Sequence, residues 1–148
     1  MGFRLKPRAH MKINLLSILA LAAFSVTAVP AAQALDEQQF QKLMKEVGKA
    51  AKAMKDNAQA KNAAVVVKDS TRTAAIFKQM AAFWKVRHAD DAAALSEKSS
   101  SAASATAAAA KAGDWNGVKS NWGTVGQNCK TCHEKHREKL DDGSFRIK

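Results

Sequence analysis

The sequence predicts an all-α protein, an antiparallel four-helix bundle, and three observations lead to this class. Both prolines, Pro7 and Pro30, lie near the N-terminus, so the chain after them has no proline to break a helix interior. Alanine, the strongest helix former, is abundant throughout that part, which also argues against a β-sheet. Four amphipathic stretches follow one another with short connections, and short connections place neighbouring helices antiparallel.

The first 34 residues have the composition of an export signal. Residues 4–12 contain four basic and no acidic side chains, and residues 13–29 form an apolar run. Ala32-Gln33-Ala34 then offers small residues at the two positions that signal peptidase reads. We expect cleavage after Ala34, so residues 1–34 are the signal peptide and residues 35–148 the domain. Both Met1 and Met11 are suitable start sites.

An uncleaved membrane anchor is the alternative interpretation of this N-terminal segment. The apolar run is on the short side for a transmembrane helix, and the cleavage site favours its removal. We therefore expect no stable membrane insertion after cleavage and a periplasmic location.

The first two helices are predicted over residues 36–57 and 63–84. In each, the residues expected to face inward recur at alternating steps of three and four, as on one face of a helix. In the first helix these residues are Phe40, Leu43, Val47, Ala50 and Met54. In the second they are Thr73, Ile76, Met80 and Phe83.

The third helix is predicted over residues 90–112, ending at Gly113. Its residues 99–110 contain only Ser, Ala and Thr, which is also typical of a flexible linker. We favour a helix, because alanine is the best helix former and small side chains allow close approach of a neighbour. A thin helix also leaves room inside the bundle for a large planar cofactor.

The fourth helix is predicted from Asp114, a good N-cap residue, to position 140. Its inward face is the most regular in the chain and consists of Trp115, Val118, Trp122, Val125, Cys129, Cys132, His136 and Leu140. The remaining tail, residues 141–148, either folds back over one end of the bundle or frays.

The segment Cys129-Lys130-Thr131-Cys132-His133 has the spacing of a c-type haem attachment motif. Two cysteines one helical turn apart lie on one face, where each thiol can add to a different vinyl group of one porphyrin. The following histidine can then supply an axial nitrogen to the iron. The sequence therefore predicts one covalently bound haem c. Gly123 and Gly126, one turn above the motif, would let the porphyrin approach the backbone.

Two thiols at this spacing also occur in two other kinds of site. A dithiol redox site needs a strand-helix-strand context, and no strand pattern surrounds the motif. A zinc site could use Cys129, Cys132, His133 and His136, but zinc sites usually separate their two ligand pairs by a long loop. Haem attachment outside the cytoplasm also agrees with the export signal.

The charge of the exported chain indicates its partners. Residues 35–148 contain 20 of the 24 Lys and Arg residues and all 13 Asp and Glu residues, which leaves a net charge of +7. A positive balance favours acidic partner proteins or a negatively charged membrane surface. Nucleic acid is not an expected partner, because the lysines are spread along the chain rather than clustered.

Residues 122–139, WGTVGQNCKTCHEKHREK, resemble the pattern F/W-x-x-V-G-x-x-C-x-x-C-H-x-x-Y/H-R of the class II c-type cytochromes. This family comprises cytochrome c′ and its low-spin relatives, which carry the motif in the last helix of a four-helix bundle. Arg137 matches the basic residue four positions after the axial histidine, which the resemblance places near the haem. Dimers are common in the family, so the resemblance also allows a homodimer.

The resemblance also implies a distal iron ligand in the first helix. Family members carry there a pattern similar to R-x-x-x-M-K-x-x-G, and Met44, Lys45 and Gly48 match its second part. Phe40 stands in place of the arginine. Met44 is therefore the candidate sixth ligand, by resemblance.

Other side chains compete with Met44 for a role at the iron. Met44 is alternatively a packing residue, since its neighbour Leu43 lies on the inward stripe. Met54 and Met80 are rival ligands. Of the remaining histidines, we expect His88 to be exposed and His136 to touch the haem edge or a propionate.

Two functions follow. The first is one-electron transfer by a six-coordinate haem with His133 and Met44 as axial ligands, in exchange with acidic redox partners. The second is binding of nitric oxide or another small gas by a five-coordinate iron. No distal acid–base pair is visible in the sequence, so we do not expect an enzyme.

Overall fold

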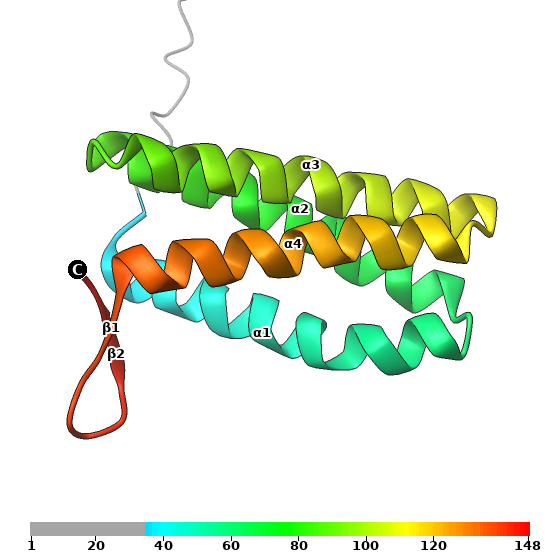
Figure 1. Ribbon diagram of the computed structural model, residues 1–148, viewed down its shortest axis with the longest axis horizontal. Coiled ribbons are helices and arrows are strands. Elements are labelled where there is room, and N and C mark those ends of the chain that lie inside the picture. The colour runs from blue at the N-terminus through cyan, green and yellow to red at the C-terminus, as the bar shows by residue number, and fades with distance from the viewer. Residues whose placement is uncertain (1–34) are drawn as a thin grey trace, which may run out of the picture. The chain divides into compact units, whose positions relative to one another are not determined.

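Four α-helices form most of residues 35–148, the part of the chain that the computed structural model describes. They are α1 (Glu37–Gln59), α2 (Ala63–Val86), α3 (Asp90–Ala112) and α4 (Trp115–His136). Successive helices run in opposite directions and pack side by side (Figure 1). This confirms the all-α four-helix bundle, and the first three helices lie within two residues of their predicted ends. The predicted signal peptide falls outside the described residues.

The helix ends follow from local side-chain chemistry. Asp36 caps α1 by accepting a hydrogen bond from the Gln39 backbone N–H at 2.7 Å, and the Gln39 side chain accepts from the Asp36 N–H at 3.1 Å. Asp114 caps α4 by accepting from the Gly117 N–H at 2.8 Å. Gly113 ends α3 with a φ of 72°, a left-handed conformation that glycine adopts without a steric penalty.

The core consists of the predicted inward faces. The four stripe residues of α2, Thr73, Ile76, Met80 and Phe83, are all buried. Those of α1 and α4 are buried or half-buried. The helical interpretation of residues 99–110 is also confirmed, and small side chains of α3 fill much of the interface with its neighbours: Ala92, Ala93, Ser99, Ala102, Ala103, Thr106, Ala107 and Ala110.

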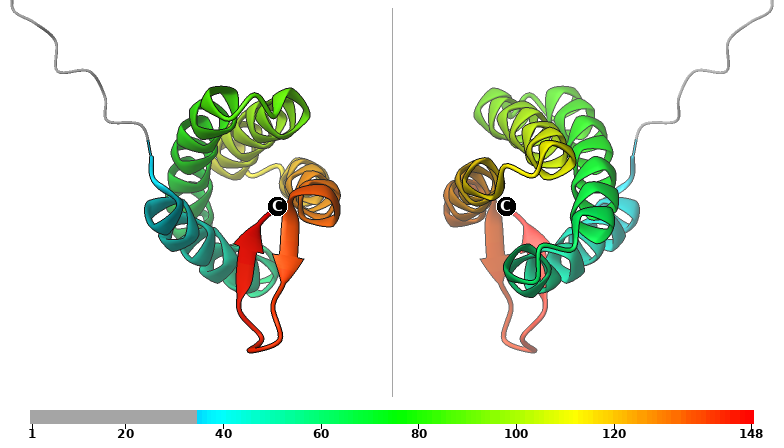
Figure 2. Two further views of the ribbon diagram at one scale, coloured as in Figure 1. Left: turned by 90° about the vertical axis from the view of Figure 1, so that its left-hand side faces the viewer. Right: turned by 90° about the vertical axis from the view of Figure 1, so that its right-hand side faces the viewer.

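The helices do not approach one another equally closely. Seen end-on, they follow one another around the bundle axis (Figure 2). α2, α3 and α4 pack closely because α3 has small side chains, whereas α1 and α4 touch each other least among the neighbouring pairs. The bundle is therefore widest between its first and last helices. Within residues 35–148, none of the helices combines the length and apolar character needed to cross a membrane.

The predicted end of the fourth helix is wrong. α4 stops at His136, and Arg137 takes up an extended conformation with φ −121° and ψ 131°. A short strand follows, β1 (Arg137–Lys139), which pairs antiparallel with β2 (Phe145–Ile147) in the register Arg137↔Ile147, Glu138↔Arg146 and Lys139↔Phe145. The tail therefore folds back as a β-hairpin instead of fraying.

The hairpin turn explains why the helix ends early. Gly143 adopts a φ of 81°, and the Asp142 carboxylate accepts a hydrogen bond from the Ser144 N–H at 2.8 Å. These residues reverse the chain so that the strands can pair. The hydrogen bonds of the ladder then replace those that further helical turns would have made.

Replacing Gly113 with alanine is expected to lower the free energy of unfolding by about 1 kcal/mol, because a Cβ penalises the left-handed conformation at this helix end. The matched control is Gly123→Ala, within α4, where an added Cβ would meet no atom within 4 Å. That change is expected to raise the free energy by about 0.5–1 kcal/mol, since alanine favours helix. Urea unfolding followed by circular dichroism measures both. Equal stability of the two variants would contradict this account.

Candidate cofactor site

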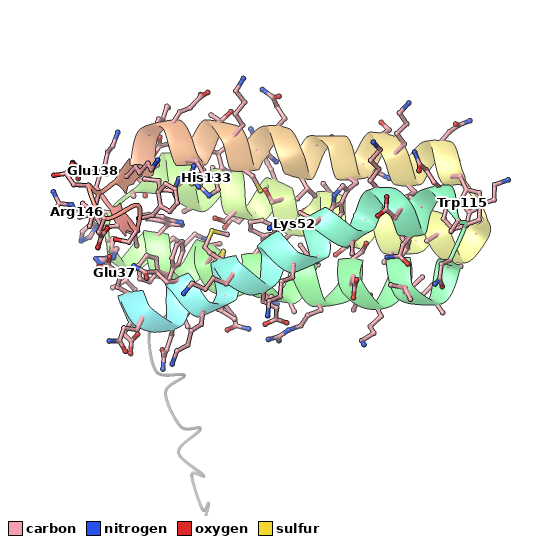
Figure 3. All side chains as sticks on the ribbon, turned by 90° about the horizontal axis from the view of Figure 1, so that it is seen from below. Glu37, Lys52, Trp115, His133, Glu138 and Arg146 are labelled. Carbon is pink, nitrogen blue, oxygen red and sulfur yellow. The ribbon has the colours of Figure 1, made fainter. Side chains whose placement is uncertain are left out.

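The cysteine-histidine motif occupies the last turns of α4. Cys129 and Cys132 are free thiols, and both are half-buried, as is His133. In Figure 3, His133 lies toward the hairpin end of the bundle, the end that also carries Glu37, Glu138 and Arg146, whereas Trp115 lies at the opposite end. The three motif side chains line a common cavity.

This cavity has a volume of about 590 Å³, within the range of roughly 300–1,000 Å³ typical of small-molecule and cofactor sites. α4 and α1 supply most of its lining, Trp84 of α2 also lines it, and the hairpin contributes residues 143–147. The cavity occupies the wide part of the bundle. Its volume is therefore a consequence of how the four helices pack.

The lining of the cavity is divided by polarity. Phe40, Val47 and Trp84 provide buried apolar surface. The cationic lining residues Lys45, Arg137 and Arg146 are exposed and therefore lie toward solvent. Such a site suits a large apolar ligand that carries carboxylates at one edge, which is the character of a haem with its two propionates.

Met44 lies on the α1 wall, half-buried, and lines the same cavity as His133 on α4. Of the three methionines in residues 35–148, Met44 alone does so. Met80 is buried in the main core, and Met54 belongs to a second core cluster with Val66, Ala110 and Val118. The geometry thus gives no support to Met54 or Met80 as iron ligands.

The departure from the family pattern at position 40 has a structural explanation. Phe40 is only 7% exposed and stacks on Phe83 with ring centroids 4.5 Å apart. It also meets Trp84 edge-on at 5.3 Å. An aromatic side chain therefore builds the cavity wall where family members carry an arginine.

The electrostatic environment keeps the motif side chains neutral at neutral pH. Burial raises the pKa of the Cys129 thiol to about 11, and the neighbouring Cys132 adds to this. Burial also raises the pKa of Cys132, with a smaller contribution from Asp91. The pKa of His133 is lowered, chiefly by burial and then by Arg137. A neutral imidazole has a free lone pair for a metal, so this shift favours ligation.

His136 also lines the cavity, and a partner from α3 fixes its orientation. Its Nε2 lies 3.0 Å from Asp91 Oδ1, and Lys135 donates to the other carboxylate oxygen at 3.2 Å. These contacts, with Lys135 first and His136 second, lower the pKa of Asp91. Sequence reasoning missed Asp91, because it lies 45 residues from His136 and no local pattern links the two.

The hairpin is the second feature that sequence reasoning missed. It contributes Phe145, Arg146 and Ile147 to the cavity. The Gln41 side chain on α1 donates to the Phe145 carbonyl at 3.3 Å, and Glu37 accepts from the Ile147 N–H at 3.5 Å. These bonds join the hairpin to α1, so the strands help to close the space between the first and last helices.

Arg137, which the family resemblance places near the haem, lines the cavity. Its guanidinium stacks over the Phe145 ring at 4.3 Å. Gly123 and Gly126 are exposed and lie outside the cavity, so the structure does not bring them to the candidate site. Gly48 of α1 lines it instead, with open space where a Cβ would be. His88 is exposed, as expected.

The donor set separates the haem interpretation from the zinc alternative. In the described part of the chain, no three His, Cys, Asp or Glu side chains converge to hold a metal ion. A structural zinc site takes four such ligands and a catalytic one three, and the side chains of Cys129, Cys132, His133 and His136 do not converge in either way. A haem brings the porphyrin nitrogens itself and needs only axial ligands from the protein. The residues present therefore fit a haem.

No protein-family model, curated protein or solved structure matches this chain. The likeness to the class II cytochromes therefore depends on the motif residues alone.

Proposed function

We propose that this protein is a periplasmic class II c-type cytochrome that transfers single electrons. Cys129 and Cys132 would hold one haem c through thioether bonds, with His133 and Met44 as the axial ligands of its iron. The observation that carries the proposal is the cavity of about 590 Å³ between α1 and α4. The attachment motif lines it from one helix and Met44 from the other.

Each motif residue has a distinct task in this function. When bound, the haem supplies an iron that changes its charge by one electron. His133, kept neutral by burial, offers a lone pair to that iron. Met44 would offer a thioether sulfur as the second protein ligand of the iron, which would raise the reduction potential. An iron held by both residues would have no free position for a substrate, which favours electron transfer over catalysis.

The surrounding residues control water and charge. Phe40, Phe83 and Trp84 form an aromatic cluster that is at most 7% exposed and limits water on one side of the cavity. The exposed cations Lys45, Arg137 and Arg146 lie where an approaching protein would meet the site. Positive charge there attracts acidic redox partners, more strongly at low ionic strength.

The optical spectrum of the purified protein tests this function. The full chain is expressed with its N-terminal segment in a host that attaches haem c in the periplasm. The expected product carries haem after denaturation and shows a low-spin six-coordinate spectrum that carbon monoxide leaves unchanged. A high-spin spectrum that changes with carbon monoxide or nitric oxide would contradict electron transfer and support gas binding. Protein without covalent haem would overturn both.

A further inference from the structure

Asn128, directly before the first cysteine, contains a buried amide nitrogen, Nδ2, that has no hydrogen-bond partner among residues 35–148. Native proteins pair nearly all such groups, and an exception in a structure without water often marks a missing solvent molecule. Rotating the amide by half a turn would bury its oxygen instead. That oxygen would still lack a donor, because the hydroxyl hydrogens of nearby Ser96 and Ser99 are already used.

A small cavity of about 20 Å³ lies beside this amide. Ser96 and Ser99 of α3 line it opposite Asn128, and both serines are buried. Ser96 Oγ donates to the Ala92 carbonyl at 2.9 Å and Ser99 Oγ to the Leu95 carbonyl at 2.8 Å. Each serine oxygen therefore keeps lone pairs that can accept a hydrogen bond.

We propose that this cavity is a binding site for one water molecule between α3 and α4. The water accepts a hydrogen bond from Asn128 Nδ2 and donates to Ser96 Oγ and Ser99 Oγ. The volume suits one water and nothing larger, and three hydrogen bonds are typical of a buried water. An ion is excluded, because no charged side chain lines the cavity. Much of the lining is apolar, but cavities that stay empty have no polar group to hold a water, whereas this one has the amide of Asn128 and the hydroxyls of Ser96 and Ser99.

The same cavity is lined by Met44, Cys129, Cys132 and His133, which also line the large cavity. A polar group there stabilises the more highly charged oxidised state of a neighbouring iron. The water would thus lower the reduction potential, with Asn128 acting as a positioning residue. This effect on the potential rests on the proposed function, whereas the water site itself does not.

High-resolution crystal structures of the wild-type protein and the Asn128→Leu variant test the site. We expect one ordered water with the three named partners in the wild type and its loss in the variant, because leucine has a similar size but no donor. A redox titration of both proteins is expected to show a higher reduction potential in Asn128→Leu. The control Asn116→Leu, at an exposed position of α4, should keep both the water and the potential.

Three results would contradict the inference. A dry cavity in the wild type, or water unchanged in Asn128→Leu, contradicts the site, and an unchanged potential contradicts the effect on the iron. Should Asn128→Leu not fold, the double variant Ser96→Ala/Ser99→Ala removes both acceptors and should also lose the water. Protein that carries no haem would refute the proposed function alone, since crystallography detects the water without haem.

Discussion

The double variant Cys129→Ala/Cys132→Ala is expected to lose covalent haem completely. The sequence contains two cysteines, both in the motif, so no other thiol can form a thioether. Haem staining after denaturing electrophoresis, together with the intact mass, measures attachment in the wild type and the variant. Any haem in the variant should be extracted by acidified acetone, whereas the wild type should retain it.

The matched control for this variant is Thr131→Ala, between the two cysteines. Thr131 Oγ1 only donates to the Gln127 carbonyl, at 3.1 Å, and alanine favours the helix. Thr131→Ala should therefore keep covalent haem at the wild-type level. Haem that remains attached in the double-alanine variant would show that the motif is not the attachment site.

The helices could be predicted because their signals are local. Asp36 and Asp114 supply side-chain acceptors at helix starts, and Gly113 supplies the left-handed residue at a helix end. The burial of each inward face follows from residue spacing. Even the run of Ser, Ala and Thr in α3 could be assigned, since alanine favours helix without any tertiary contact.

The hairpin could not be predicted in the same way. His136 and Leu140 continue the spacing of the fourth helix, so the periodicity extends past the point where the helix ends. Strands of three residues are too short for an alternating pattern to be seen. Their pairing depends on tertiary contacts with Glu37 and Gln41, about a hundred residues earlier in the chain.

The candidate site was predicted only as far as its residues follow one another in sequence. Cys129, Cys132 and His133 come from a compact motif. The contact between Asp91 and His136, and the position of Ser96 and Ser99 opposite Asn128, join different helices and leave no trace in local spacing. Such contacts depend on how α3 and α4 pack.

Met44 lines the cavity although the residue spacing of α1 does not place it on the inward face. That spacing places Leu43 on the inward stripe and Met44 one position beside it. In a tightly packed bundle that position would face the edge of the core. Because α1 and α4 are the least closely packed neighbours, this edge borders the large cavity. A residue beside the stripe can therefore reach a cofactor there.

Replacing Met44 with alanine is expected to convert a low-spin six-coordinate haem into a high-spin five-coordinate one. Alanine has no sulfur, and in residues 35–148 no other methionine lines the cavity. The variant should therefore bind carbon monoxide, which we expect the wild type to exclude, and its reduction potential should fall because methionine ligation raises it. Optical spectra in both oxidation states, with and without carbon monoxide, measure the change.

Met54→Ala and Met80→Ala are the matched controls, since each removes one methionine sulfur from the buried core. Met54 is 4% and Met80 1% exposed, so each change should lower the free energy of unfolding by about 2–5 kcal/mol. Their spectra should nevertheless stay low-spin, because neither side chain lines the cavity. An unchanged spectrum in Met44→Ala, or a high-spin one in either control, would mean that Met44 is not the sixth ligand. Loss of stability and loss of ligation are thus separated within one set of substitutions.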